Sequence, residues 1–107
     1  MNSADLTTLD KLQRWYLSRC DGDWEHGLGV KIETLDNPGW HIRIDLKGSQ
    51  AESSTVNWVK IDRTESDWMH YRVNNKEFYS ACGPLNLSEA IDTFLEWVEG
   101  ARDREST

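Results

Sequence analysis

The amino-acid sequence predicts a two-layer α+β domain, in which an antiparallel sheet of about five strands is covered by an N-terminal and a C-terminal helix. Apolar residues near both ends of the chain recur at three- and four-residue spacing, the period of an amphipathic helix. Between them, apolar and polar residues alternate in segments separated by Gly, Pro, Asn or Asp, as in strands joined by turns. Because the chain has 107 residues, no linker and no internal repeat, we expect one domain over residues 1–107.

The first helix is predicted over residues 5–19. The residues of its apolar face are Leu6, Leu9, Leu12, Trp15 and Tyr16. Gly22 lies just beyond the helix and supplies a left-handed stop. This helix therefore has one face with which to cover the sheet.

The predicted strands are residues 30–34, 40–47, 55–63, 68–73 and 78–82. Residues 36–39 (Asp-Asn-Pro-Gly) form the turn between the first two strands, and Asn74 and Asn75, which tolerate positive φ, join the last two. Consecutive strands with short turns predict an antiparallel meander. Trp58 and Val59 are adjacent, so in the third strand either both faces are covered or a bulge intervenes.

The last helix is predicted from Asn86 to a point near Gly100. Asn86 with Glu89 fits an N-cap pattern, although Ser88 is a rival cap. The apolar stripe that follows consists of Leu87, Ala90, Ile91, Phe94, Leu95 and Val98. Residues 1–4 and 102–107 are expected to fray.

The net charge of −7 is unevenly distributed. Residues 21–45 hold six acids and two bases, and residues 86–107 also hold six acids and two bases. No cluster of Lys or Arg is present, which disfavours direct nucleic-acid binding because phosphate neutralisation needs such a patch. Acidic surface favours a basic protein partner and speeds its association.

The sequence also bears on the compartment of the protein. No apolar run is long enough to span a membrane, and the N-terminus shows no signal-peptide pattern, so we expect a cytoplasmic protein. Cys20 and Cys82 follow no C-x-x-C spacing. In a reducing compartment they are expected to be free thiols, with a disulfide between them as the alternative.

Residues 20–27, between the first helix and the first strand, concentrate chemically active side chains. Asp23, Glu25 and His26 provide acid and base groups and possible metal ligands. The spacing matches no calcium loop, and zinc would need more converging Cys or His. The alternative is a helix-terminating turn with solvated acids, so we expect no metal and no other cofactor.

Two further features each have a structural and a functional interpretation. Trp15, Trp40 and Trp58 lie on predicted apolar faces, whereas Trp24 lies in a polar loop. Trp24 either covers the sheet edge with its N–H bonded to an acceptor, or anchors an interface. Five acids share one face of the last helix, which is either solvated or a docking surface for a basic protein. They are Glu89, Asp92, Glu96, Glu99 and Asp103.

Several of these strings together resemble a known family. Trp15-Tyr16 is followed by C-D-G-D-W-E-H at residues 20–26, G-V-K-I at residues 29–32 and T-L-D-N-P-G-W at residues 34–40. In this order they resemble bacterial immunity protein family fifty-three of polymorphic toxin systems. The resemblance is sharpest over residues 12–46 and extends in pattern through the final helix. It implies a small cytoplasmic α+β protein, encoded beside a toxin, that binds the toxin and blocks its activity without catalytic residues.

We therefore expect an immunity protein that neutralises a cognate toxin by stoichiometric binding. Its carboxylates would pair with cationic groups of a basic, nuclease-like toxin. The candidate partner-binding residues are Asp21, Asp23, Trp24, Glu25, His26, Asp36, Asn37, Glu96 and Glu99. The alternative function is a small metal-dependent or acid/base hydrolase that uses Asp23, Glu25 and His26. A homodimer also stays open, because an open sheet leaves two edges.

Overall fold

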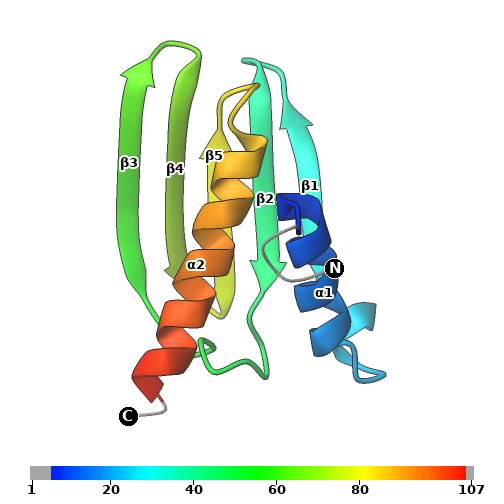
Figure 1. Ribbon diagram of the computed structural model, residues 1–107. Helices are drawn as coiled ribbons and strands as arrows, with labels where there is room; N and C mark the ends of the chain where they lie inside the picture. Colours follow the sequence, from blue (N-terminus) through cyan, green and yellow to red (C-terminus); the bar gives the residue numbers. More distant parts are fainter. Residues whose placement is uncertain (1–5, 106–107) are drawn as a thin grey trace.

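Two helices cover one face of a five-stranded antiparallel sheet, which confirms the predicted α+β class (Figure 1). The computed structural model describes the backbone of residues 6–105 and the side chains of residues 6–101. The helices are α1 (Thr8–Arg19) and α2 (Leu87–Glu105), and a short 3₁₀ turn, η2 (Trp24–His26), precedes the sheet. The strands are β1 (Val30–Leu35), β2 (Gly39–Asp45), β3 (Val56–Thr64), β4 (Asp67–Asn74) and β5 (Glu77–Cys82).

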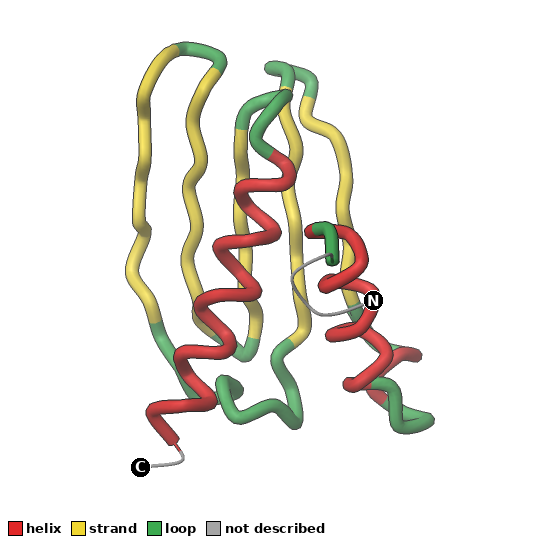
Figure 2. The backbone as a smooth tube through the Cα atoms, viewed as in Figure 1, coloured by secondary structure: helices red, strands yellow, loops and turns green. Residues whose placement is uncertain are grey.

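The strand order is β1-β2-β5-β4-β3, so the predicted meander is wrong at one connection. β2 pairs with β5 instead of β3, and the chain between β2 and β3 runs past the end of the sheet to its far edge (Figure 2). The short turns force adjacency only within the pairs β1–β2, β3–β4 and β4–β5. The longer polar segment from Leu46 to Thr55 imposes no such constraint, and the result is a Greek-key arrangement.

The turn between β4 and β5 lies one residue later than predicted. Asn74 pairs with Glu77 in the sheet, which leaves Asn75 and Lys76 as a two-residue loop. Both loop residues have positive φ, 49° and 63°, as a type I′ turn requires. The right-handed twist of the strands favours this turn type. Lys76 therefore adopts the left-handed conformation, which Gly, Asn and Asp favour more than lysine does.

Strand β3 contains the bulge that the adjacent Trp58 and Val59 suggested. Its register against β4 shifts between Val56 and Val59. The extra residue turns Trp58 away from the helices, and its side chain is 47% exposed. The prediction that Trp58 belongs to the core is therefore wrong.

The core lies between the sheet and the two helices. Ile42, Ile44 and Phe78 are fully buried on the helix-facing side of the sheet. The ring of Phe78 lies 5.0 Å from that of Phe94 on α2, and Trp15 on α1 lies 4.8 Å from Phe94. Phe94 is thus the point at which both helices and the sheet meet.

The two helices begin in different ways. Thr7 and Asp10 form a capping box at the start of α1. Asn86 directly precedes α2 and Ser88 lies inside it, but the Asn86 side chain bonds the backbone of Trp68 and the side chains of Asp67 and Glu89. The helix does not end near Gly100: its backbone continues to Glu105, so residues 102–105 are helical where fraying was expected. Residues 1–4 and 106–107, also expected to fray, lie outside the described residues.

Both cysteines are free thiols, as predicted. Cys82 is buried in β5, and its burial raises the pKa of the thiol to about 11. Cys20 follows α1 as its C-cap. No helix in the described part of the chain has the length and apolar character needed to cross a membrane.

Candidate partner-binding site

Trp24 is a structural residue of the first loop. Its side chain is 8% exposed, and its indole N–H donates a hydrogen bond of 3.1 Å to the backbone oxygen of Asp45. Its ring packs edge-on against Trp15 at 5.8 Å and at a tilt against Tyr16 at 5.6 Å. Of the two interpretations drawn from the sequence, these contacts support the one in which Trp24 closes the edge of the core.

The carboxylates of Asp21 and Glu25 hold the backbone of this loop. Asp21 Oδ1 accepts hydrogen bonds from the N–H groups of Trp24 and Asp23. These bonds lower the pKa of the Asp21 carboxyl. Glu25 accepts from the N–H groups of Asp21 and Gly22, at 2.9 and 2.8 Å. Its own backbone N–H and these two donors lower the pKa of Glu25.

Asp23 and His26 are exposed in this loop, as is Asp21. The described residues contain no group of three or more His, Cys, Asp or Glu side chains arranged to hold a metal ion. Glu25, the third member of the candidate hydrolytic set, already accepts two backbone hydrogen bonds. The carboxylates of Asp21 and Glu25 therefore hold the backbone of the loop that joins α1 to β1.

Asp36 and Asn37 lie at the opposite end of the sheet from this loop (Figure 2). Both are exposed in the turn between β1 and β2. Asn37 lines a shallow depression of about 490 Å³ together with Trp68 and His70 of β4. The two loops of the predicted contact set, residues 21–26 and 36–37, thus lie at opposite ends of the sheet.

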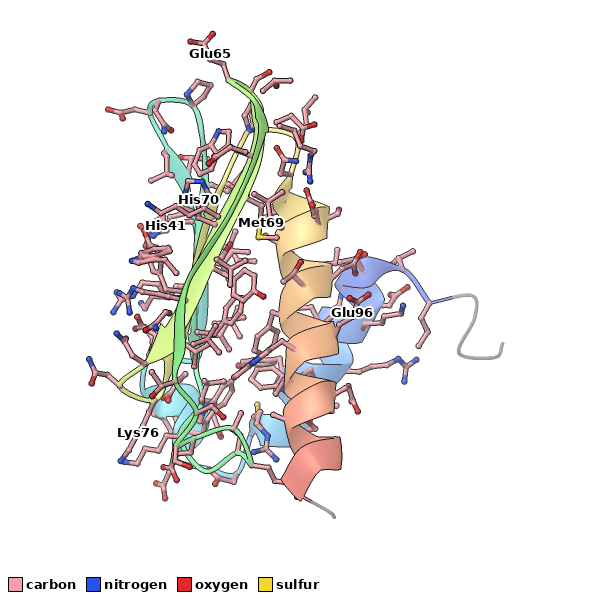
Figure 3. All side chains as sticks on the ribbon, turned by 90° about the vertical axis from the view of Figure 1, so that its left-hand side faces the viewer. His41, Glu65, Met69, His70, Lys76 and Glu96 are labelled. Atoms are coloured by element: carbon pink, nitrogen blue, oxygen red, sulfur yellow. The ribbon has the colours of Figure 1, made fainter. Side chains whose placement is uncertain are left out.

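The acidic face of α2 is only partly free. Glu89 Oε1 lies 2.6 Å from an Arg63 nitrogen, and Asp92 accepts a hydrogen bond of 2.7 Å from the hydroxyl of Thr8 on α1. Glu96 and Glu99 are exposed, and Glu96 points away from the sheet (Figure 3). The side chain of Asp103 lies outside the described residues. The candidate contacts on α2 and those of the two loops therefore face different directions.

A surface that the sequence analysis did not single out lies on the sheet. The helices leave its other face uncovered, and we call this the open face (Figure 3). Met69 and His70 are neighbours in β4, yet Met69 points to the helices while His70 points the opposite way with His41 (Figure 3). The side chains of the open face include His41, Arg43, Trp58, His70, Arg72 and Tyr79.

Arg72 lies on the open face between two aromatic rings. Its guanidinium carbon is 5.5 Å from the ring centre of Trp58 and 5.2 Å from that of Tyr79, both within cation–π range. The two rings meet edge to face at 5.9 Å. Because Trp58, Arg72 and Tyr79 come from three adjacent strands, the sheet register fixes this cluster. We call it the Arg72 cluster.

The acids of the open face are already engaged within the protein. Glu77 lies 3.0 Å from Arg43, Glu33 lies 3.6 Å from His41, and Asp62 lies 2.7 Å from His70. The described residues place no carboxylate within salt-bridge distance of Lys31, Lys60 or Arg72. Lys31, Lys60 and Arg72 are thus cations of the open face that have no partner carboxylate among the described side chains.

The signal for the open face is present in the sequence but weak. His41 and Arg43 occupy the polar positions of an alternating strand, a pattern that normally indicates solvent. The Arg72 cluster also depends on the bulge at Trp58, which shifts that residue to the other face. This face differs from an ordinary solvent-exposed sheet face in one respect. It carries an arginine and aromatic residues at outward positions of neighbouring strands.

The architecture is that of a small, acidic, two-layer α+β protein with one sheet face left bare. The family model of immunity protein 53 matches residues 9–99. The chain therefore belongs to the immunity protein 53 family, as the sequence resemblance indicated. Membership of this family implies a cognate toxin as the partner. Comparison with curated proteins gave no match, and comparison with solved structures gave none either.

Proposed function

We propose that this protein binds a cognate toxin in a stoichiometric complex and thereby neutralises it. The observation that carries the proposal is membership of the immunity protein 53 family over residues 9–99. In this proposal the protein acts by binding alone, as a non-enzyme, in the cytoplasm of the cell that makes the toxin.

The charge of the protein supports a basic toxin, such as a nuclease that holds phosphate with cationic groups. The net charge of −7 produces a field that attracts a cationic partner over a distance of about one Debye length, roughly 8 Å at physiological salt. Apart from Asp21, which holds the loop backbone, the exposed members of the predicted contact set are Asp23, His26, Asp36, Asn37, Glu96 and Glu99. In our proposal these residues steer the toxin or contact it at the rim of the interface.

Three members of the predicted set that make contacts within the protein have an indirect part in the same proposal. Trp24, Asp21 and Glu25 hold the loop, so they act by fixing the positions of Asp23 and His26. A substitution at Trp24 would then alter binding only through the shape of the loop.

Co-expression with the product of the adjacent reading frame tests the proposed function. We expect that this product stops growth when it is expressed alone, and that the present protein restores growth and co-purifies with it. Titration calorimetry on the purified pair should give a fixed whole-number stoichiometry. Failure to restore growth together with failure to co-purify would refute the proposal.

A further inference from the structure

We propose that the toxin docks on the open face and places a carboxylate against Arg72. This inference rests on the proposed function and goes beyond it, because it names the contact surface and the chemistry that the toxin presents there. It also differs from the expectation drawn from the sequence, in which the acidic loops and the acidic face of α2 make the contact.

The first argument is the geometry of Arg72. The rings of Trp58 and Tyr79 restrict the guanidinium group, and Asn74 accepts a hydrogen bond from it. An arginine held in this way loses little conformational entropy when it binds. The planar fork of N–H donors matches a carboxylate, and the described residues supply none within salt-bridge distance.

The second argument is the local charge. Glu77 pairs with Arg43, and Glu33 and Asp62 lie 3.6 and 2.7 Å from His41 and His70, whereas Lys31, Lys60 and Arg72 have no carboxylate partner among the described side chains. A partner surface with carboxylates is therefore complementary to the open face. The overall negative charge of the protein acts at longer range and attracts the basic region of a toxin. An acidic region of the same toxin then docks on the open face.

The third argument is the residue types. Trp58 is 47% exposed although its ring is held by Arg72 and Tyr79. Trp, Tyr and Arg are the residues enriched at the energetic centres of protein interfaces. Here they lie on β3, β4 and β5, toward one edge of the sheet, with the Arg43–Glu77 ion pair and the His70–Asp62 contact beside them. Polar groups beside a hot spot help to exclude water from it when a partner docks.

The experiment measures binding of the purified product of the adjacent reading frame to the wild-type protein and to three variants. Trp58→Ala removes an anchor, and Arg72→Gln removes the charge and the fork. Arg14→Gln is the matched control, because it removes an exposed arginine from α1 in the helical layer. We expect Trp58→Ala and Arg72→Gln each to weaken binding about 30-fold or more, as at an interface hot spot, and the control to stay within about threefold. Circular dichroism checks that each variant is folded.

The outcomes separate this inference from the proposed function. If the wild-type protein binds and both open-face variants bind equally well, the open face is not the interface, while the proposed function stands. If the wild-type protein does not bind, both proposals fail.

A second measurement needs no variant. A carbodiimide joins amines to carboxylates that are in contact, so in the wild-type complex it should link Lys60 or Lys31 to acids of the toxin. Links that instead join Glu96, Glu99 or Asp23 to toxin lysines would place the interface elsewhere.

Discussion

The indole N–H of Trp24 donates a hydrogen bond of 3.1 Å to the backbone oxygen of Asp45, the last residue of β2. One side chain thus joins the loop after α1 to the end of a central strand. The same ring packs against Trp15 and Tyr16, so the loop, the helix and the sheet are tied together at this point. The loop that looked most like a chemical site in the sequence is held by structural contacts.

Trp24→Ala should destabilise the protein by about 3–5 kcal/mol, because it removes a buried ring and leaves a cavity. Urea denaturation followed by circular dichroism measures this loss. Trp58→Ala is the matched control, since the same truncation at a half-exposed ring should cost about 1 kcal/mol or less. Equal losses at the two positions would contradict the assignment of Trp24 to the core.

Asn86→Ala should cost about 1–3 kcal/mol, because it leaves a backbone donor without its acceptor. Asn86 Oδ1 accepts from the N–H of Trp68, and its amide nitrogen donates to Asp67 and Glu89. The exposed rival cap gives the control: Ser88→Ala should change stability by no more than about 0.5 kcal/mol. A larger loss at Ser88 than at Asn86, measured by denaturant titration, would contradict this structural role of Asn86.

Glu25→Gln should weaken the dependence of stability on acid. In the folded protein the pKa of Glu25 lies below its ordinary value of 4.5, so ionised Glu25 stabilises the folded state above that pH. This contribution is lost as the pH falls from about 4.5 through the lowered folded-state pKa. Thermal melts between pH 7 and pH 3 should therefore show a shallower acid decline in the variant. The exposed carboxamide control Asn37→Ala should retain the wild-type slope.

The double variant Glu96→Lys/Glu99→Lys should slow association with the toxin several-fold while it leaves dissociation nearly unchanged. Both side chains are exposed on the helical layer, where charge acts on the approaching partner over a distance. The effect should shrink as salt is added, because screening weakens long-range attraction. Surface plasmon resonance at two salt concentrations gives both rates. A strongly raised dissociation rate would mean that α2 lies inside the interface.

The sequence was sufficient for the fold class because each helix and strand has its own period. The apolar stripe of the last helix and the alternation around Ile42 and Ile44 specify which face of each element is buried. The order of the strands in the sheet is not predicted in this way. Apolar and polar residues alternate along a strand in the same pattern whichever strand lies beside it. The pairing of β2 with β5 therefore had no local signature.

The candidate site was harder to predict than the fold. The acidic loops are visible in the sequence as clusters of Asp and Glu. In the structure, however, the carboxylates of Asp21 and Glu25 accept hydrogen bonds from the backbone of their own loop. The Arg72 cluster is assembled from three strands, so it exists only once the register is known. One bulge in β3 decides whether Trp58 joins the core or the open face, and a count of alternating residues does not reveal it.

The pairing of β2 with β5 also affects the order in which the protein is completed during synthesis. The first two strands emerge from the ribosome early, yet the strand that joins them to the rest of the sheet is the last of the five to be made. Contacts between such distant parts of a chain form late and slowly. A truncated chain that ends before β5 would lack the middle of its sheet and one ring of the Arg72 cluster. A ribosome must therefore translate the chain through β5 before the complete sheet and the Arg72 cluster are able to form.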